Sequence, residues 1–453
     1  MIFKPFEDLF EIPLRNGLTK PKVVRGEGYK MVNMGELFAV PRMINIPMDR
    51  VPLLPRELET SLLEHGDLLF ARQSLVRDGA GQCSIFLFDD EKVCFESHLI
   101  RCRLDKEIAN PLFYYYFFRS SIGKQTIDAI IEQGAGAAGI RGSDLAKISV
   151  PYVDKTIQDT IAEQLSAIDD KIELNRQINR TLEQIAQTIF KSWFVDFEPV
   201  KAKIEGKAAG RDPERAAMCA ISGKCESELD QLPSEQHQQL AATAALFPDE
   251  LVESELGLIP EGWEVKSITD VSTFASGKVD VSALSLENYI STENMLENKG
   301  GVSSAASLPT VATVPSFSKG QVLISNIRPY FKKIWLARFA GGRSNDVLAF
   351  NARERDCTEF LYNLLYQDDF FEFMMRTSKG AKMPRGDKDA IAGWKFPCAN
   401  HELRSFFSGK VRPYYSYIES LNAEVHQLSL TRDCLLPKLL SGEIKINEVV
   451  NGD

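Results

Sequence analysis

The sequence predicts two copies of a mixed α/β domain, of the α+β kind, joined by two long helices that pack as an antiparallel coiled coil. The first observation is an internal repeat with approximate two-fold symmetry: Gly66-Asp67-Leu68-Leu69-Phe70 reappears as Gly320-Gln321-Val322-Leu323-Ile324 after 254 residues. The second is an apolar stretch ending at Pro151, and again at Pro397, each followed by heptad-spaced apolar residues. A repeat this long indicates a duplicated domain plus helix, so two similar working surfaces are expected.

Later parts of the repeat keep the same order at a slightly different spacing. The aromatic run Phe113 to Phe118 matches Phe360 to Leu365 at an offset of 247, and the two prolines lie 246 residues apart. Arg141-Gly142 and Arg385-Gly386 occupy the loops before the prolines and are taken as counterparts. The two copies are therefore collinear.

Length and composition are those of an ordinary globular protein. At about 150 residues per domain, 453 residues correspond to roughly three folded units. The hydrophobic share of 44% and the charged share of 26% fit this class, and no apolar run approaches the ~18 residues of a membrane span. The first residues, Met1 to Asp8, carry no secretory pattern. We expect a cytoplasmic protein that contacts no membrane.

Cysteine and charge patterns narrow the function further. The eight cysteines are scattered without a C-x-x-C pair, which favours reduced thiols over a disulfide or zinc framework. The net charge of -10 counts against a protein that simply coats DNA with a basic face. Residues 201–260 contain six Lys or Arg against eleven Asp or Glu, so local basic patches remain compatible with the acidic total.

Residues 1–152 are predicted to form the first α/β domain. Apolar runs of strand length occur without a regular alternation of strands and helices. A helix that contains the aromatic run is predicted from about Asn110 to Glu132. The strand-like runs are Val32 to Met34, Leu68 to Ala71, Ser84 to Phe88 and Leu99 to Leu104.

A first helical spacer is predicted over residues 153–198. Asp154 or Thr156 can cap its start, and apolar residues then recur with a helical period over nearly 40 residues. At 1.5 Å per residue the helix is on the order of 58 Å long, which indicates a coiled-coil strut.

Asparagines at seam positions are candidates for setting the register of the helix pair. A buried polar seam residue fixes register at a cost in stability. The alternative is that these residues face solvent where the apolar stripe drifts. The candidates are Asn175 and Asn179 in the first helix and Asn422 in the second.

The segment after the first spacer is rich in Ala, Gln, Glu and Ser, so a largely exposed and partly flexible linker with at most short helices is expected. The second domain opens at Gly257 to Trp263, a stretch that ends in Pro260-Glu261-Gly262-Trp263. The second spacer begins near Asn400 and closes before Ser441-Gly442, where the glycine can act as a C-cap. In order, these parts are the linker 199–256, the second domain 257–398, the second spacer 399–442 and the C-terminal tail 443–453.

Two patterns resemble chemical motifs but lack the required context. Gly134-Ala135-Gly136-Ala137-Ala138-Gly139 matches G-x-G-x-x-G, yet it follows a predicted helix end where the dinucleotide motif needs a strand. Cys94, His98 and Cys102 lie in strand-like runs, which favours ordinary core or surface roles over metal binding. The sequence shows no phosphate-binding G-x-x-x-x-G-K-[ST] loop and no convincing nucleophile with a base. We therefore predict no catalytic residues, no metal site and no bound cofactor.

Loop residues offer chemistry for DNA contacts. The aromatic run can in principle stack on bases, but a buried helix is favoured because the other copy keeps apolar residues at matching positions. Arg and Lys read guanine edges and hold phosphates, and Gln reads adenine. For each candidate the alternative is a solvated surface charge. The candidates are Arg72, Gln73, Arg77 and Arg141 in the first copy and Arg328, Lys332, Lys333, Arg343, Lys382 and Arg385 in the second.

Two helix-end motifs, with the strand motifs before them, carry a resemblance to a known family. Lys191-Ser192-Trp193-Phe194-Val195-Asp196-Phe197 closes the first spacer, and Leu435-Leu436-Pro437-Lys438-Leu439-Leu440-Ser441-Gly442-Glu443-Ile444 closes the second. In this order the chain resembles, over essentially its whole length, the specificity subunit of type I restriction-modification systems. One departure is the N-terminus, which lacks the Pro-Glu-Gly-Trp opening of the second copy.

The resemblance implies two target recognition domains, each binding one half of a split double-stranded DNA target. It implies helical spacers that set the gap and dock methyltransferase (modification) subunits, two of them. Those subunits would carry S-adenosylmethionine and methylate adenine, while restriction/translocase subunits would add ATP-driven translocation and Mg-dependent cleavage. A chain of this kind performs no chemistry itself.

Arg72-Gln73-Ser74 differs from Asn326-Ile327-Arg328 in the matching loop, so an asymmetric bipartite target is expected, with the helix pair as a ruler. The alternative function is a coiled-coil protein-interaction scaffold without DNA readout, which the net charge supports. A third is a self-contained nuclease or methylase, although no activity is expected of the isolated chain.

Overall fold

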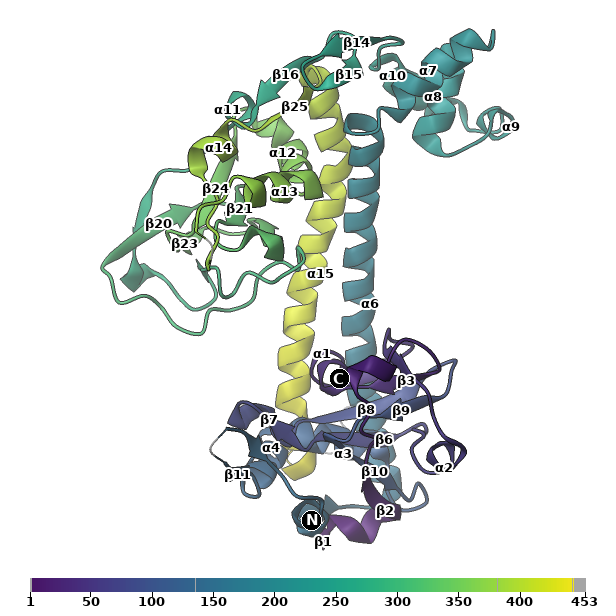
Figure 1. The fold of residues 1–453 in the computed structure, drawn as a ribbon, viewed down its shortest axis with the longest axis vertical. Coiled ribbons are helices and arrows are strands. Elements are labelled where there is room, and N and C mark those ends of the chain that lie inside the picture. Colours follow the sequence, from purple (N-terminus) through teal and green to yellow (C-terminus); the bar gives the residue numbers. More distant parts are fainter. Residues whose placement is uncertain (1, 135, 381, 442, 444–453) are drawn as a thin grey trace. The chain divides into compact units, whose positions relative to one another are not determined.

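The computed structural model describes residues 2–134, 136–380, 382–441 and 443. The chain divides into two compact units, the first made of Met1–Arg176 with Asn422–Asp453 and the second of Gln177–Leu421. Figure 1 shows that each unit contains β-sheets and lengths of the two long helices α6 and α15. The two units are described separately below.

The first unit is built around a five-stranded sheet in the order β2-β10-β6-β8-β4. The neighbouring strands β10 and β6 are buried along their whole length, and apolar residues predominate in both, although β10 also carries two arginines. The strands are β2 (Phe10–Asn16), β4 (Arg42–Ile44), β6 (Asp67–Ala71), β8 (Cys83–Phe88) and β10 (Leu99–Leu104).

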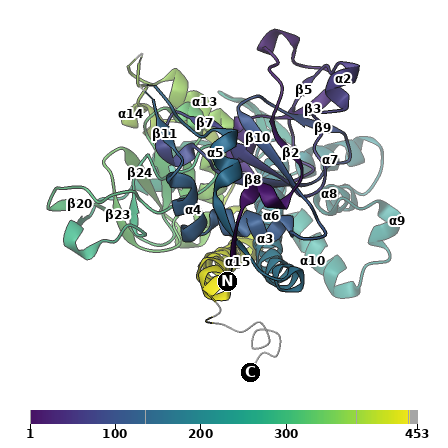
Figure 2. The same cartoon turned by 90° about the horizontal axis from the view of Figure 1, so that it is seen from below.

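Helix α3 (Pro111–Arg119) and the first part of α6 (Lys155–Phe194) cover one face of this sheet (Figure 2). Every aromatic side chain from Phe113 to Phe118 is buried. Ile161 and Leu165 of α6 join the same core. The interpretation of the aromatic run as a buried helix is therefore confirmed.

The predicted helix from Asn110 to Glu132 is wrong in its extent. The chain instead forms α3 and a second helix, α4 (Ser121–Asp128). The break occurs at Ser120, whose hydroxyl accepts a hydrogen bond of 3.1 Å from the backbone N–H of Gly123 and so caps a new helix.

Smaller elements complete the first unit. A three-stranded sheet, β5-β3-β9, covers the other face of the large sheet, and a second, β11-β12-β7, lies in the predicted loop region. Of the predicted strand-like runs, the first is split between β3 and α1. The remaining elements are β1 (Ile2–Pro5), β3 (Tyr29–Val32), α1 (Met34–Ala39), β5 (Asp49–Val51), α2 (Pro55–Leu58), β7 (Gln73–Ser74), β9 (Val93–Phe95), β11 (Glu132–Gln133), β12 (Ala138–Gly139), α5 (Gly142–Lys147) and β13 (Ser149–Tyr152).

The second unit repeats this plan with two four-stranded sheets, β17-β24-β21-β22 and β18-β20-β23-β19. Helix α12 packs on the first of these sheets within a large apolar core. The elements are β16 (Glu264–Ser267), α11 (Ile268–Val271), β17 (Ser272–Phe274), β18 (Lys278–Asp280), β19 (Tyr289–Ile290), β20 (Thr313–Phe317), β21 (Val322–Ser325), β22 (Ile334–Leu336), β23 (Gly341–Arg343), β24 (Val347–Ala352), α12 (Thr358–Leu365), α13 (Asp368–Arg376), α14 (Lys388–Ala392) and β25 (Lys395–Cys398).

Backbone pairing shows where the structural repeat begins. Ile2 pairs with Tyr152 in the first unit as Glu264 pairs with Cys398 in the second. The duplication predicted from the sequence is therefore present in the fold, and its two copies start at Ile2 and Glu264. Gly66 and Gly320, which open the repeated strand motif, adopt φ values of 89° and 87°, a region that favours glycine in both copies.

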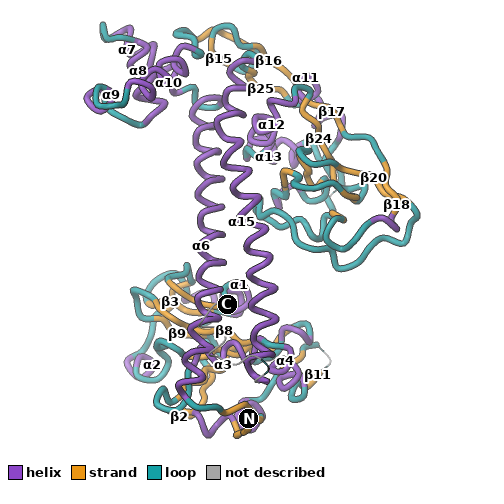
Figure 3. Tube along the Cα trace, turned by 180° about the vertical axis from the view of Figure 1, so that it is seen from behind, coloured by secondary structure: helices purple, strands orange, loops and turns teal. Residues whose placement is uncertain are grey.

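The expected flexible linker is a folded helical segment, which corrects the prediction for residues 199–256. Three of its four helices share a small core of Ala217, Met218, Leu229 and Ala244, and the fourth packs against one of them through Gly206 and Ala216 (Figure 3). Because the helices are short and their buried positions are often alanine, the helical periodicity of apolar residues in this segment is weak. The sequence therefore resembles that of an exposed linker. The helices are α7 (Glu198–Ala208), α8 (Pro213–Ser222), α9 (Glu226–Leu229) and α10 (Ser234–Ala245), followed by the hairpin β14 (Leu251–Ser254) and β15 (Gly257–Pro260).

The two long helices run antiparallel in both units. In the first unit, Asp169 of α6 contacts Arg432 of α15 (His401–Ser441), and Asn175 of α6 contacts Glu424. Residue numbers thus increase along α6 in the direction in which they decrease along α15. In the second unit, Phe190 of α6 packs on Phe407 with ring centroids 5.6 Å apart. Helix α6 has 40 residues and α15 has 41, matching the predicted strut lengths.

The starts of the long helices also agree with the sequence. Asp154 accepts a hydrogen bond of 3.0 Å from the backbone N–H of Thr156, and Asn400 accepts one of 2.9 Å from that of Leu403. These are N-cap contacts. The predicted C-cap, Gly442, lies outside the described residues.

The predicted register residues differ in their surroundings. Asn175 is fully buried and donates from Nδ2 to Glu424 at 2.9 Å, while its Oδ1 has no hydrogen-bond partner among the described residues. Asn179 is half-buried, and Asn422 is exposed, so Asn422 does not occupy a buried seam position. A role in register stays a prediction for Asn175.

Candidate nucleic-acid interface

Each unit carries one pair of hydrogen-bonded loops after its repeated strand motif. Loop pair 1 consists of residues 72–82 with 136–141, and loop pair 2 of residues 326–333 with 382–387. In loop pair 1, the backbone N–H of Ile140 donates to the carbonyl of Arg72 at 2.9 Å. In loop pair 2, the N–H of Gly386 donates to the carbonyl of Asn326 at 3.0 Å. The structure thus repeats one backbone frame under different side chains.

Glycine permits the close approach of the two strands in each frame. A Cβ on Gly139 would lie 2.9 Å from the carbonyl oxygen of Arg72. A Cβ on Gly386 would lie 2.5 Å from Oδ1 of Asn326. Both contacts are shorter than ordinary carbon contacts. At Gly139 the opposing atom belongs to the backbone, so this position requires glycine, whereas a side chain at Gly386 would displace the buried Asn326 side chain.

The frame corrects one sequence alignment. The matching hydrogen bonds make Ile140 the counterpart of Gly386, so Gly139 corresponds to Arg385. Arg141 is the N-cap residue of α5, and its counterpart at the start of α14 is Asp387. Arg141 and Arg385 therefore do not occupy equivalent positions, although both lie in the paired loops.

The basic candidates of the first unit are mostly neutralised. Arg77 donates to Asp128 at 2.9 Å, and Arg141 donates to Glu132 at 2.8 Å. Arg72 reaches the carbonyl of Ser97 at 3.4 Å. Gln73 is exposed on β7. Loop pair 1 therefore presents an amide beside ion-paired arginines.

Loop pair 2 presents more uncompensated positive charge. Arg328 and Lys382 are exposed, and neither side chain has a hydrogen bond or ion pair within the described ranges. Arg385 is paired with Asp346 at 2.7 Å. Lys332 is paired with Asp368 at 2.9 Å, and Lys333 donates to the carbonyl of Thr292 at 2.9 Å.

Arg343 is a structural residue, which corrects its assignment as a contact candidate. Its side chain is buried, and its guanidinium donates to the carbonyls of Ser316 and Ala275 at 3.2 and 3.1 Å and to that of Val347. Burial lowers the pKa of Arg343. The guanidinium is therefore engaged inside the domain through all three of its nitrogens.

Sequence reasoning passed over several exposed side chains in the same loops. Leu75 is 87% exposed in loop pair 1, and Tyr330 is 49% exposed in loop pair 2. Lys379, beside loop pair 2, is ion-paired with Asp387. Leu75 and Tyr330 were not predicted as contact residues because apolar residues are normally expected to be buried. Their place in the same loops as the basic candidates was the signal that could have identified them.

The motifs that resembled chemical sites have structural explanations. Gly139 belongs to β12, which pairs with β11, so it does not lie at the start of a helix as the dinucleotide motif requires. Cys94 of β9 and Cys102 of β10 are buried in two different apolar clusters, and burial raises the pKa of the Cys94 thiol to about 12.

One metal-compatible cluster occurs in the part of the chain that the structure describes. A ligand atom from each of Glu354, Cys357 and His401 lies within 4.8 Å of the others. However, Glu354 is salt-bridged to Arg404, and His401 is paired with Asp356 at 3.0 Å. The carboxylate and the imidazole are thus already engaged, and a guanidinium stands beside them.

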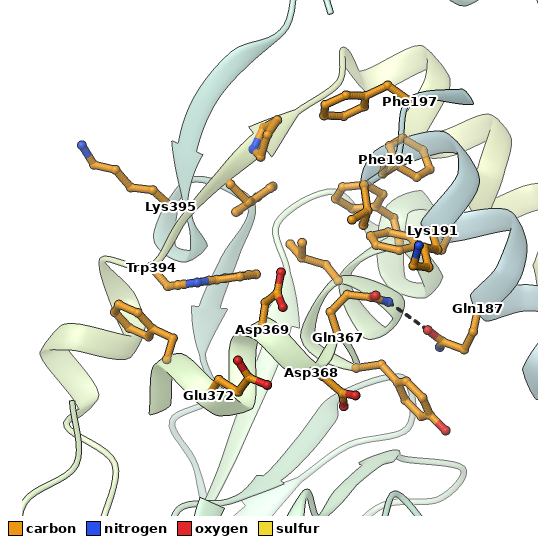
Figure 4. A pocket seen from close by; sticks show the side chains of 18 of the residues that line it. Gln187, Lys191, Phe194, Phe197, Gln367, Asp368, Asp369, Glu372, Trp394 and Lys395 are labelled. Atoms are coloured by element: carbon orange, nitrogen blue, oxygen red, sulfur yellow. Dashed lines mark hydrogen bonds between the residues drawn. The ribbon is translucent and has the colours of Figure 1, made fainter. Parts of the chain in front are cut away.

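The second unit also contains a groove with a volume of about 720 Å³ between the end of α6, helices α12 and α13, and β25. Figure 4 shows Trp394 beside Asp369 and Glu372 at one side, with Gln187 hydrogen-bonded to Gln367 at the other. Asp369 and Glu372 are exposed and have no ion-pair partner among the described residues. An aromatic face beside free carboxylates suits a Lys or Arg side chain of a partner.

Comparison with known proteins agrees with this architecture. The family model of the type I restriction modification DNA specificity domain matches residues 3–184. The type I restriction enzyme HindI specificity subunit of Haemophilus influenzae is 28% identical over 434 residues, covering 89% of this chain and 92% of the relative. The MjaIX specificity subunit of Methanocaldococcus jannaschii is 23% identical over 368 residues, with 76% and 71% covered.

A solved structure shares the fold. The S subunit of a type I restriction-modification system from M. genitalium aligns over 97% of this chain and 95% of its own, with a TM-score of 0.52 and 15% identity. None of the described helices combines the length and apolarity needed to cross a bilayer. The chain is thus similar over most of its length to type I restriction-modification specificity subunits, and its first part matches the model of their DNA specificity domain.

Proposed function

We propose that this chain gives a type I restriction-modification complex its DNA sequence specificity, with each unit reading one half of a bipartite double-stranded target. The repeated backbone frame of the two loop pairs carries this proposal. One frame holding different exposed side chains suits two different half-sites, so the target is asymmetric. Gln73 stands in the first loop pair where Ile327 stands in the second, and only the second has free Arg328 and Lys382.

The test is genome-wide methylation sequencing of the host with and without this gene. The expected result is loss of methylation at one motif with two unequal halves and a fixed gap. Replacement of residues 326–333 and 382–387 by those of a relative should change one half of that motif and leave the other. A change in both halves, or in neither, would contradict the assignment of one half-site to each loop pair.

Catalysis in this proposal belongs to partner subunits. Two methyltransferase (modification) subunits would carry S-adenosylmethionine, and restriction/translocase subunits would use ATP and Mg. This chain would supply docking surfaces along its helical spacers. The groove beside Trp394 supports such a role in the second unit, because its free carboxylates can bind a basic side chain of the modification subunit.

Docking can be tested with charge-neutralising variants of nearly constant shape. Asp369→Asn combined with Glu372→Gln should reduce co-purification of the modification subunit, since the cation would lose both counter-charges. Glu287→Gln, at an exposed carboxylate in another loop of the same unit, is the control. If the double variant and the control co-purified with equal amounts of the modification subunit, the docking surface would have to lie outside this groove.

The continuous helices support a role as a ruler. Four extra residues lengthen a helix by about 6 Å, which is a little under two base pairs at roughly 3.4 Å each. Inserted into both long helices at a matched position, they should lengthen the methylated gap. An unchanged gap in a stable, active complex would exclude the ruler.

The net charge of -10 favours one alternative, a coiled-coil scaffold that binds only proteins. A DNA mobility shift of the complex that weakens steeply with salt and disappears with a scrambled target would separate the two functions.

A further inference from the structure

Strand β10 places two arginines on an otherwise apolar face of the first unit. Ile100, Cys102 and Leu104 point to the core under α3, while Leu99 points to the opposite core. Because side chains alternate along a strand, Arg101 and Arg103 share the face of Leu99. Both are nearly buried, with 4% and 9% exposure.

Arg103 has a full set of acceptors. Its Nε and Nη2 donate to the two carboxylate oxygens of Asp67, each at 2.7 Å, and Nη2 also reaches the carbonyl of Leu62 at 3.2 Å. Glu64 adds a further ion pair. A buried charge paired in this way is a common structural device.

Arg101 has no such partner. Its guanidinium makes no hydrogen bond or ion pair within residues 2–134, 136–380, 382–441 and 443, and its Nε is a buried donor without an acceptor. The Phe95 ring, 5.9 Å from the guanidinium carbon, is its aromatic contact. On the adjacent strand β6 it faces Leu69.

The residue facing Arg101 on its other side is a second arginine. Arg15 of β2 pairs directly with Arg101 across the antiparallel ladder, which brings the two side chains onto one face. Arg15 is exposed and also has no partner among the described residues. Like charges directly opposite each other destabilise a sheet, and here no carboxylate lies between them.

The charge on Arg101 cannot be avoided by deprotonation. Burial lowers the pKa of Arg101, Asp67 opposes that shift, and Arg103 and Arg15 add to it. A guanidinium nevertheless stays protonated in proteins. Contact with one aromatic ring compensates less than the loss of hydration, so an acceptor from outside the chain would stabilise the buried guanidinium of Arg101.

We propose that Arg101 and Arg15 form a binding site for a phosphate-type oxyanion. Arg101 is the buried floor of the site, and exposed Arg15 is its entrance. The fork of guanidinium donors matches an oxyanion with several oxygens. Free phosphate and a backbone phosphate of DNA have this chemistry in common. Since Leu99, two residues before Arg101, pairs with Ala71 beside loop pair 1, a DNA phosphate is compatible with the proposed function.

The site itself is tested without DNA. Thermal unfolding of the full chain is followed while inorganic phosphate replaces chloride at constant ionic strength. The midpoint of the wild type should rise by roughly 2–4 °C. Arg101→Met should abolish that rise and should unfold at a higher temperature than the wild type in chloride, because it removes an unpaired buried charge.

Arg15→Met is the second variant, since its exposed position leaves the core unchanged, and it should at least halve the phosphate effect. Arg56→Met, at an exposed arginine of the same unit, is the control and should respond like the wild type. A wild type that phosphate does not stabilise, or equal stabilisation of Arg15→Met, overturns the site.

DNA binding distinguishes the sources of the anion. If a DNA phosphate fills the site, Arg15→Met in the assembled complex should lower the slope of log affinity against log salt by about 1 and spare the methylated motif. An unchanged slope together with the lost thermal response would assign the site to free phosphate. Since the thermal experiment contains no DNA, its failure leaves the proposed reading function untouched.

Discussion

The hydroxyl of Tyr116 donates a hydrogen bond of 3.0 Å to Oδ2 of Asp169, which ties helix α3 to the long helix α6 in the first unit. The second unit makes the same connection with the donor reversed. There the hydroxyl of Tyr415 on α15 donates to Oδ1 of Asn363 on α12 at 3.1 Å. In each copy a buried tyrosine hydroxyl therefore helps to attach the duplicated domain to its long helix.

Asp169 also anchors the second long helix, because Arg432 donates to its Oδ1 at 2.7 Å. Burial opposes the charge of Arg432, yet the bond to Asp169 raises its pKa. We predict that Asp169→Asn lowers the free energy of unfolding by about 2 kcal/mol, and Tyr116→Phe by about 1 kcal/mol. Urea denaturation measures both. Equal effects would show that the pair with Arg432 adds nothing.

Stability should fall with rising pH through the titration of Glu183 in the second unit. Burial raises the pKa of Glu183 above its ordinary value of 4.5, although Gln187, Arg338 and two tyrosines partly offset this. Between the unfolded and the folded pKa, the folded state holds the extra proton, so deprotonation destabilises it as pH rises. We predict that Glu183→Gln raises the melting temperature at pH 7 and flattens its decline above pH 4.5.

Glu287→Gln serves as the control for this pH dependence, because its carboxylate is exposed in a loop of the same unit. That variant should follow the wild-type curve. A Glu183→Gln protein that melts lower than the wild type at pH 7 would contradict the assigned sign.

Substitution of Arg343 should lower stability, whereas substitution of Arg328 should weaken DNA binding. Arg343→Met removes the guanidinium that donates to one buried and two partly buried carbonyls, and it should lower the free energy of unfolding by about 2 kcal/mol. Arg328→Gln should change it by less than about 0.5 kcal/mol, yet weaken DNA binding of the complex roughly tenfold. Urea denaturation and binding titrations at fixed salt separate the two. Loss of binding without loss of stability in Arg343→Met would restore it as a contact residue.

Asn175 offers a test of register. Asn175→Leu removes an amide whose Oδ1 is buried without a partner, so we predict a gain of roughly 1 kcal/mol in the free energy of unfolding. The register of the helices should loosen, and methylation should appear at more than one gap length. Arg176→Leu, at the exposed neighbouring position, should leave the gap unique. A single unchanged gap in Asn175→Leu would remove Asn175 from register control.

The long helices and the repeat were predictable because both depend on patterns that persist over many residues. A helical period over nearly 40 positions leaves few alternatives, and the caps at Asp154 and Asn400 marked its starts. Residues 199–256 were misjudged because their core uses Ala217 and Ala244, which contribute little apolar contrast.

The site was less predictable, because a loop arginine carries no mark of what it contacts. Arg343 donates to the carbonyl of nearby Val347 and to those of Ser316 and Ala275, which are distant in sequence, so no local pattern predicts its burial. The mismatch of Arg141 with Arg385 arose because the loops between the repeated elements differ in length. Only the hydrogen bonds of Ile140 and Gly386 gave the true alignment.

Those two backbone bonds also bear on how such a protein can diverge. Peptide groups supply them, so most loop side chains can be exchanged while the frame persists, provided that Gly139 and Gly386 are kept. Substitution of the side chains that face outward therefore does not disturb the fold. Related chains can therefore acquire new surface chemistries by successive single substitutions, with each successive variant still folded.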